Sequence, residues 1–204
     1  MIQERNVSQN VVNAELYVLG GSLTTNIPTI ADYLASVGQI LSPLNAPYER
    51  LVEDLSVLAE RLNEVHRNGG RVYVCGNGGS AANAAHLTLH LRDRKIRAFD
   101  LGADVPWLTA TANDHGYERI FSMALHALDA GAQDLLVVIS GSGNSKNILA
   151  GLTVGAKRGL PSWGLLGMGG GKAAGLCTGT VIVDSDSYGV IEDIHSVAIH
   201  ALTL

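Results

Sequence analysis

The chain of 204 residues is poor in the residues that define several protein classes. It has two cysteines, Cys75 and Cys177, which are too few for a disulfide or zinc-finger framework, and we expect both thiols to be reduced. No apolar stretch reaches the length of a membrane-spanning helix, and the first residues lack a signal-peptide pattern. These absences predict a cytoplasmic protein that does not enter a membrane.

Positive charge is sparse as well. Lys and Arg number 14 against 19 Asp and Glu, which gives a formal net charge of −5. Without a basic run, the sequence predicts no binding of nucleic acid or of an anionic membrane surface. Glycine is abundant at 24 residues but has no period, which excludes a collagen-like chain. Hydrophobic residues make up 47% of the chain, enough for one domain with a sizeable core.

The chain divides into a helical N-terminal part and a longer α/β part. We expect residues 1–47 to form a helical arm used in oligomerisation, with a helix over 27–41, and residues 48–204 to form the main domain. A second helix is predicted over 48–68, because five apolar residues recur there at helical spacing. These residues are Leu51, Leu55, Leu58, Leu62 and Val65.

After that helix, candidate strands alternate with helical segments, the last of them over 190–202. The strands are expected at 72–75, 96–101, 135–139, 163–168 and 180–184. Their nearly continuous apolar character is typical of parallel strands with both faces covered. The pattern therefore predicts an α/β fold, a three-layer α/β/α sandwich around a five-stranded parallel sheet, with its binding crevice beyond the carboxyl ends of the strands.

Two turns rich in glycine and serine follow the first and third of these strands. They are Gly76-Asn-Gly-Gly-Ser80 and Ser140-Gly-Ser-Gly-Asn-Ser145, and each precedes a helical run. The unpaired amides at a helix N-terminus favour an anion, and Ser140, Ser142 and Ser145 can add three hydroxyls. An ordinary turn capped by Ser145 would account for one serine but not for three. The spacing therefore favours a phosphorylated ligand.

The first turn also fits a dinucleotide-binding pattern, Gly76-x-Gly-x-x-Ala81, with Asp100 as the candidate ribose-binding acid. That pattern is frequent by chance, and it leaves the second turn without a role. Asn77 and Ser80 also suit a compact phosphate or sugar better than a pyrophosphate. We therefore expect no nicotinamide cofactor.

Histidines form the other polar pattern. His86 and His90 are four residues apart on a predicted helix and share a face, as do Glu192 and His200 on the last helix, with His195 between them. If the two helices meet, three imidazoles and one carboxylate would suit zinc or another divalent metal. Each histidine could equally be an isolated residue with a local partner, and periodicity does not show whether the helices meet.

Four segments together resemble the sugar isomerase (SIS) family, and within it the phosphoheptose isomerases. They begin at Gly76, Ala112, Ser140 and Ile191, and read GNGGSAANAAH, ANDHGYE, SGSGNS and IEDIHSVAIH. The resemblance covers about residues 48–204. It implies a homotetramer with active sites at subunit interfaces. It also implies reversible conversion of sedoheptulose 7-phosphate to an aldoheptose 7-phosphate.

The resemblance also implies roles for individual residues. The phosphate would bind Ser80, Ser140, Ser142 and Ser145. The substrate would also contact Asn77, Gly78, Arg94, Asn113 and Asp114. The metal, zinc in our expectation, would be held by His86, His90, Glu192 and His200. Of these, the candidate catalytic groups are His90, Glu192 and His200.

The chain departs from the family pattern at two of these positions. The family has Glu, its usual acid–base residue, where this chain has His90, and Gln where this chain has Glu192. A carboxylate is therefore kept but moved to the opposite helix, which could preserve, change or abolish the reaction. The alternative is a non-catalytic regulator of the same family that binds a replication initiator. That regulator lacks the histidine that this chain keeps as His200, which favours an enzyme.

Overall fold

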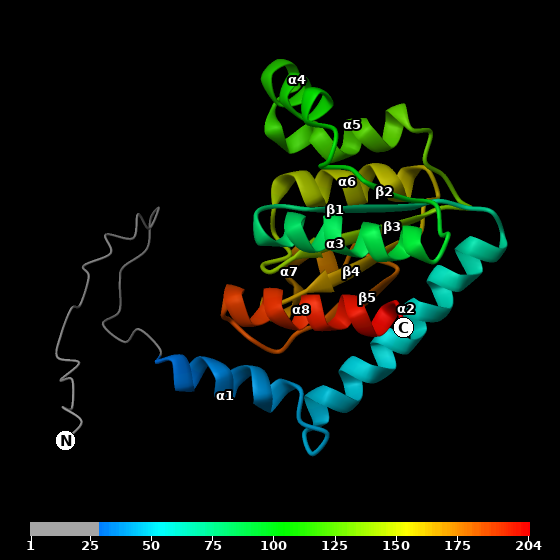
Figure 1. The fold of residues 1–204 in the computed structure, drawn as a ribbon. Helices are drawn as coiled ribbons and strands as arrows, with labels where there is room; N and C mark the ends of the chain where they lie inside the picture. The colour runs from blue at the N-terminus through cyan, green and yellow to red at the C-terminus, as the bar shows by residue number, and fades with distance from the viewer. Residues whose placement is uncertain (1–28) are drawn as a thin grey trace, which may run out of the picture.

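The computed structural model describes residues 29–204, so the first 28 residues of the arm expected over 1–47 lie outside the described residues. Two N-terminal helices are followed by alternating strands and helices (Figure 1). The strands are β1 (Val72–Gly76), β2 (Ala98–Asp100), β3 (Leu135–Ser140), β4 (Ser162–Leu166) and β5 (Gly179–Ile182). The helices are α1 (Ile30–Ile40), α2 (Ala46–Arg67), α3 (Gly79–Asp93), α4 (Val105–His115), α5 (Ile120–Ala127), α6 (Lys146–Lys157), α7 (Gly171–Ala174) and α8 (Tyr188–Leu202), with 3₁₀ turns η1 (Tyr117–Arg119) and η2 (Met168–Gly170).

The five strands form one parallel sheet in the order β2-β1-β3-β4-β5. Helices α4, α5 and α6 lie on one side of the sheet, and α2, α3 and α8 on the other (Figure 1). The predicted three-layer sandwich with a five-stranded parallel sheet is confirmed. The strand order is that of flavodoxin-like folds, in which the direction of winding reverses between β1 and β3.

Successive residues of the central strands serve two separate cores. In β1, Val72 and Val74 belong to the core shared with α2, α3 and α8, whereas Tyr73 and Cys75 belong to the core shared with α5 and α6. Side chains alternate across a strand, so a strand that is apolar at every position is buried on both faces. This is why the apolar runs predicted parallel strands correctly.

The predicted strand over 96–101 is the one that differs most from the structure. It is reduced to β2, whose three residues pair with β1 alone because β2 lies at the edge of the sheet. Ile96 and Leu101 at its two ends are buried in opposite cores, although they lie outside the strand. The apolar pattern in the sequence follows burial, so it extends beyond the three residues that form the hydrogen-bonded strand.

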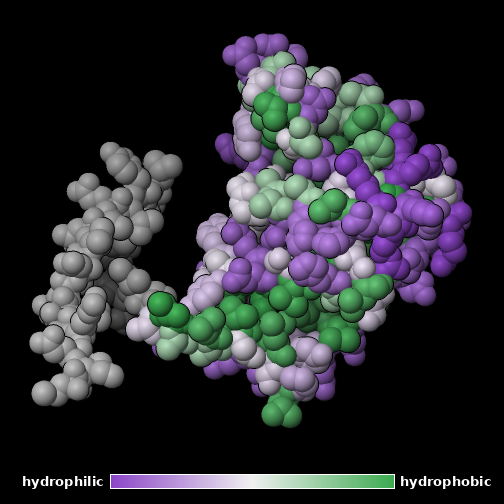
Figure 2. Space-filling model, viewed as in Figure 1, coloured by the Kyte–Doolittle hydropathy of each residue, from purple (hydrophilic) through white to green (hydrophobic). Residues whose placement is uncertain are grey.

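The two N-terminal helices pack to very different degrees. α2 buries the five apolar residues predicted for it, whereas α1 fully buries no side chain against the described part of the chain and only half-buries Tyr33, Val37 and Ile40. The Tyr33 hydroxyl of α1 donates a hydrogen bond of 2.5 Å to the Asp193 carboxylate of α8. Ile30 and Leu34 remain exposed, and hydrophobic residues gather over α1 and α8 (Figure 2). Within residues 29–204, no helix is long and apolar enough to span a bilayer.

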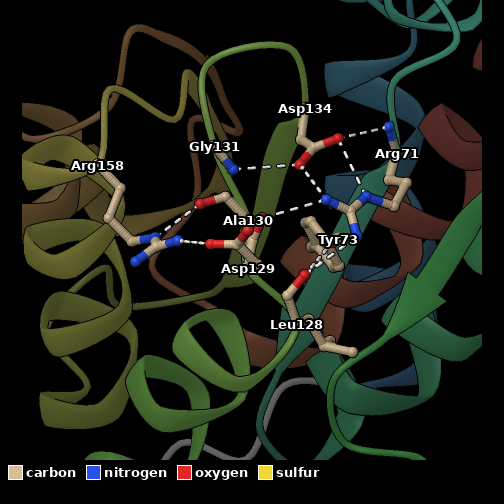
Figure 3. A network of polar contacts seen from close by, with 8 residues as sticks. All are labelled: Arg71, Tyr73, Leu128, Asp129, Ala130, Gly131, Asp134 and Arg158. Carbon is tan, nitrogen blue, oxygen red and sulfur yellow. Dashed lines mark hydrogen bonds and ion pairs between the residues drawn. The ribbon is translucent and has the colours of Figure 1, made fainter.

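Charged residues join the elements at the amino ends of β1 and β3 (Figure 3). The Asp134 carboxylate accepts hydrogen bonds of 2.8–3.3 Å from the backbone and guanidinium N–H groups of Arg71, and one of 3.1 Å from the Gly131 N–H. Arg158, the C-cap residue of α6, is tied to the same turn by the Asp129 carboxylate and the Ala130 carbonyl. We call Arg71, Asp129, Asp134 and Arg158 the amino-end clamp.

Candidate active site

The two glycine- and serine-rich turns lie side by side at the carboxyl ends of β1 and β3. These strands are neighbours, but β1 leads into α3 on one face and β3 into α6 on the other. Segments that leave adjacent strands toward opposite faces open a crevice between them. The crevice has a volume of about 310 Å³. It is lined by Asn77, Gly78, Gly79, Ser80, Ser140, Gly141, Ser142, Ser145, Tyr188 and Glu192.

Ser140, Ser142 and Ser145 are held in different ways within the second turn. The Ser140 hydroxyl accepts a hydrogen bond of 3.1 Å from the Gly143 N–H, and the Ser142 hydroxyl accepts one of 3.3 Å from the Asn144 N–H. Ser145 occupies the N-cap position of α6 with extended backbone, but its hydroxyl does not cap the helix within the described residues. A capped turn therefore does not account for Ser145, which lines the crevice at the N-terminus of α6.

A second glycine segment, between β4 and α7, supports the serine turn. The Ala173 N–H donates to the Gly143 carbonyl at 2.9 Å, and the Lys172 N–H donates to the Asn144 side chain at 3.1 Å. Gly143 has φ +61°, and a β-carbon there would overlap with the Gly170 carbonyl. No role is predicted for this segment from the sequence, because its contact with the serine turn depends on the tertiary fold.

The first turn differs from the second because a carboxylate of the protein itself lies at the N-terminus of the helix that follows it. Gly78 adopts φ +56°, and α3 begins at the next residue, Gly79. The Glu192 carboxylate lies directly over Gly79, so that a β-carbon on this residue would overlap with it. A carboxylate at a helix N-terminus is stabilised by the unpaired amides and the helix dipole. The N-terminus of α6 is therefore the better place for a ligand phosphate.

Two residues that the sequence did not single out connect the first turn to its surroundings. Asn77 and Asn147 form a reciprocal amide pair, with hydrogen bonds of 2.9 and 2.8 Å, and the Tyr117 hydroxyl donates to the Asn77 oxygen at 2.8 Å. Asn147 is only 2% exposed. No spacing rule could have found this set, because its members come from three separate segments.

His86, His90 and His200 meet within one chain. The Nε2 atoms of His86 and His90 are 2.9 Å apart, and the ring of His200 lies 4.8 and 5.2 Å from their ring centres. One nitrogen from each ring lies within 4.8 Å of the others. Two nitrogens on one tetrahedral zinc would be about 3.3 Å apart, given Zn–N bonds of ~2.0–2.1 Å. Burial and the two neighbouring imidazoles lower the pKa of His86, which favours its neutral, metal-binding form.

Glu192 shares α8 with His200 but is not part of this histidine group in the described residues. The eight residues between them correspond to about 12 Å along a helix. Glu192 instead lines the crevice with the serine turn. The backbone carbonyl of Glu192 accepts a 3.0 Å hydrogen bond from Asn83 of α3, which fixes α8 against α3. The fourth metal ligand thus stays a prediction, and within one chain the carboxylate faces the predicted phosphate-binding residues.

Three of the predicted substrate-binding residues lie outside the crevice. Arg94 follows α3 at the end away from the crevice and donates to the backbone carbonyl of Leu204. Asn113 and Asp114 lie at the end of α4, are exposed, and share a hydrogen bond of 2.7 Å. The candidate ribose-binding acid, Asp100, accepts a 2.8 Å hydrogen bond from a backbone N–H two residues further on.

His195, which lies between Glu192 and His200 in sequence, is fully buried. Its Nε2 is 3.2 Å from the Leu166 carbonyl, so this nitrogen carries the proton and donates it. Burial lowers the pKa of His195 to about 4. Its role in the described structure is therefore that of a neutral core residue.

Comparison with known proteins agrees with this geometry. Residues 32–167 match the model of the SIS domain. The chain belongs to the SIS domain family. Over 177 residues it is 36% identical to a phosphoheptose isomerase of Helicobacter pylori strain P12, which covers 84% of this chain and 90% of that protein.

Two solved structures of phosphoheptose isomerases share the fold of this SIS domain protein. The enzyme from Neisseria gonorrhoeae has a TM-score of 0.75 and 31% identity, with 85% of this chain and 91% of that chain covered. The enzyme from Francisella tularensis has a TM-score of 0.77 and 30% identity, with 85% and 92% covered. The matched part therefore spans nearly the whole length of each of these proteins.

Proposed function

We propose that this SIS domain protein is a phosphoheptose isomerase that interconverts sedoheptulose 7-phosphate and glycero-manno-heptose 7-phosphate in the cytoplasm. The observation that supports this proposal most is the crevice, in which the serine turn stands opposite the Glu192 carboxylate. A phosphate-binding turn beside an acid–base group fits an enzyme that acts on a sugar phosphate. The similar proteins named above are all phosphoheptose isomerases.

The phosphate of the sugar binds at the N-terminus of α6 in this proposal. Ser140, Ser142 and Ser145 supply hydroxyl groups, and the first amides of α6 supply N–H donors and the positive end of the helix dipole. Ser80 faces the same crevice from α3. The formal net charge of −5 makes such a local donor set necessary, because the chain as a whole repels an anion.

The chemistry requires a proton to move between adjacent carbon atoms. A base takes a proton from C1 of the ketose, an enediol forms, and a proton is returned to C2, while a second proton passes from O1 to O2. Glu192 is our candidate for the base, since its carboxylate lies in the crevice. His90 and His200 are the candidate partners for the oxygen atoms; because His200 lies about 12 Å from Glu192 along α8, the two histidines would have to reach this substrate from a neighbouring subunit.

The three imidazoles fit a divalent metal, and zinc is the metal that we propose. His86, His90 and His200 are the residues that would hold it, because one ring nitrogen of each lies within 4.8 Å of the others. Bound zinc would supply a Lewis acid that polarises a carbonyl oxygen. Elemental analysis of protein purified without an affinity tag tests this part, and substoichiometric metal would contradict it.

We further propose that the protein is a homotetramer, with active sites at subunit interfaces and residues 1–47 contributing to the interfaces. The exposed apolar residues Ile30 and Leu34 of α1 support this, because α1 fully buries no side chain within the described part of its own chain and leaves this apolar surface free for a neighbouring subunit. Arg94, Asn113 and Asp114 could then approach a site from a neighbouring subunit. Light scattering at micromolar concentration tests the assembly, and a stable monomer would contradict it.

A non-catalytic regulator is the second function that the sequence left open. The converging histidines and the carboxylate in the crevice favour an enzyme, because a protein-binding role alone requires neither. The decisive experiment is an NMR time course with sedoheptulose 7-phosphate, other ketose phosphates and free sedoheptulose, with and without zinc. We expect conversion of the heptose phosphate and none of the free sugar. No conversion of any substrate would favour the regulator.

A further inference from the structure

The amide pair of Asn77 and Asn147 joins the two ligand-binding turns. Asn77 belongs to the turn after β1, and Asn147 to the first turn of α6, directly after the serine turn. Tyr117 reaches the same pair from η1. Asn77 lines the crevice, whereas Asn147 is buried. One ligand-facing residue is therefore held by two residues behind it.

The orientation of both amides follows from a backbone donor. The Ile148 N–H can only donate, and it is 2.9 Å from the Asn147 side-chain oxygen. This identifies the acceptor end of Asn147, so the other end, its NH₂ group, donates to the oxygen of Asn77. The Asn77 NH₂ group in turn donates to the Asn147 oxygen. The two amides cannot rotate independently without losing several hydrogen bonds.

Counting donors and acceptors shows what remains for a ligand. The Asn77 oxygen accepts from Asn147 and from the Tyr117 hydroxyl, which uses both of its lone pairs. The Asn77 NH₂ group has two hydrogens, and only one has a partner among residues 29–204. Asn77 can therefore offer an N–H donor to the crevice but no acceptor.

Building on the proposed function, we propose that Asn147 and Tyr117 are positioning residues that fix the Asn77 amide with its N–H toward an oxygen acceptor of the sugar phosphate. The same pair sets the spacing between the first turn and the serine turn, because it bridges the segments on which both are built. Beside the Asn77 amide, the crevice therefore favours a ligand group that accepts hydrogen bonds, such as a phosphate or a carbonyl.

A double-mutant cycle tests this proposal through the dissociation constant for sedoheptulose 7-phosphate, measured by calorimetry. Tyr117→Phe removes the hydroxyl that donates to Asn77, and we expect binding to weaken about 3- to 10-fold. In an Asn77→Ala background the same change should alter binding less than about 2-fold, because Tyr117 acts only through Asn77. Tyr48→Phe, which removes a hydroxyl on α2, is the matched control and should have no effect.

Other outcomes of the cycle are equally clear. If Tyr117→Phe weakened ligand binding equally in both backgrounds, Tyr117 would contact the ligand directly. If it weakened binding in neither background, the network would not position Asn77. Either result would overturn the proposal. The Asn147→Ala and Asn77→Ala cycle gives an independent reading, with thermal unfolding to confirm folding. Absence of any binding by the wild-type protein would instead refute the proposed function.

Discussion

The two ends of the parallel sheet use polar residues in opposite ways. At the amino end, the guanidinium of Arg71 donates to the Asp134 carboxylate and to two backbone carbonyls, so that the clamp satisfies its own charges. At the carboxyl end, within the described residues, the Ser145 hydroxyl does not cap its helix and one N–H of the Asn77 side chain has no partner. Polar groups at the carboxyl end are left for a ligand, whereas those of the amino-end clamp are paired with one another. This difference indicates that the amino end of the sheet serves stability and the carboxyl end serves ligand binding.

Replacement of Glu192 should have the largest effect on activity and little effect on stability. If Glu192 is the base, Glu192→Gln should lower kcat by ~10²-fold or more. Stability should change by no more than about 1 kcal/mol, since only the contact with the N-terminus of α3 is altered. Steady-state kinetics and urea unfolding measure the two quantities. A large loss of stability with unchanged kcat would contradict the assignment of Glu192 to the active site and not to the stability of the fold.

The amino-end clamp should show the opposite behaviour. Asp134 is 1% exposed, and Asp134→Ala leaves the N–H groups of Arg71 and Gly131 without their acceptor. We expect a loss of about 2–3 kcal/mol in the free energy of unfolding, allowing for partial solvation of Arg71. The kcat of the folded protein should be unchanged.

Asp129→Asn is the matched control for the clamp. The Asp129 side chain is 93% exposed, and it pairs with Arg158 at the surface. Asparagine also tolerates its left-handed backbone, φ +48°. The expected change is within about 0.5 kcal/mol. If both variants lost the same free energy of unfolding, burial of the Asp134 carboxylate would not be the cause of the loss.

The sequence predicted some features of these two ends of the sheet and missed others. Continuous apolar strands predicted the sheet, and the serine spacing predicted a crevice that the structure places between β1 and β3. Asn147 and Tyr117 could not be predicted, because hydrogen bonds between distant segments leave no periodicity in sequence. Clamp residues such as Arg71 escaped notice for the same reason.

His195 should make stability depend on pH. Its folded-state pKa of about 4 lies below the ordinary value of 6.5, so the unfolded chain binds a proton in this interval and the folded chain does not. Stability should therefore fall as pH decreases from 6.5 toward 4, by about 2 kcal/mol between pH 7 and pH 5. Urea unfolding with a chelator present, to remove metal effects, should show a smaller pH dependence in His195→Gln. Identical pH dependence in both proteins would contradict a buried neutral His195.

Apart from the Asp129→Asn control, the serine turn should show the smallest of these effects. Ser142→Ala or Ser145→Ala should weaken binding of a sugar phosphate by ~1–2 kcal/mol, because a hydrogen bond to a charged group is lost. Stability should stay nearly constant, unlike in the clamp variant. Calorimetry with sedoheptulose 7-phosphate and free sedoheptulose measures both affinities. Equal affinity for the two sugars would exclude a phosphate-binding role for the turn.

Solvent deuterium incorporation tests the central claim most directly, because it detects the proton transfer itself. Sedoheptulose 7-phosphate is incubated with the protein in D₂O, with zinc and with a chelator in parallel, and the product is examined by NMR. We expect an aldoheptose 7-phosphate with deuterium at C2 from the wild-type protein, and at least about 10²-fold slower formation from Glu192→Gln. Neither conversion nor deuterium incorporation at any zinc concentration would contradict an isomerase at the carboxyl end of the sheet.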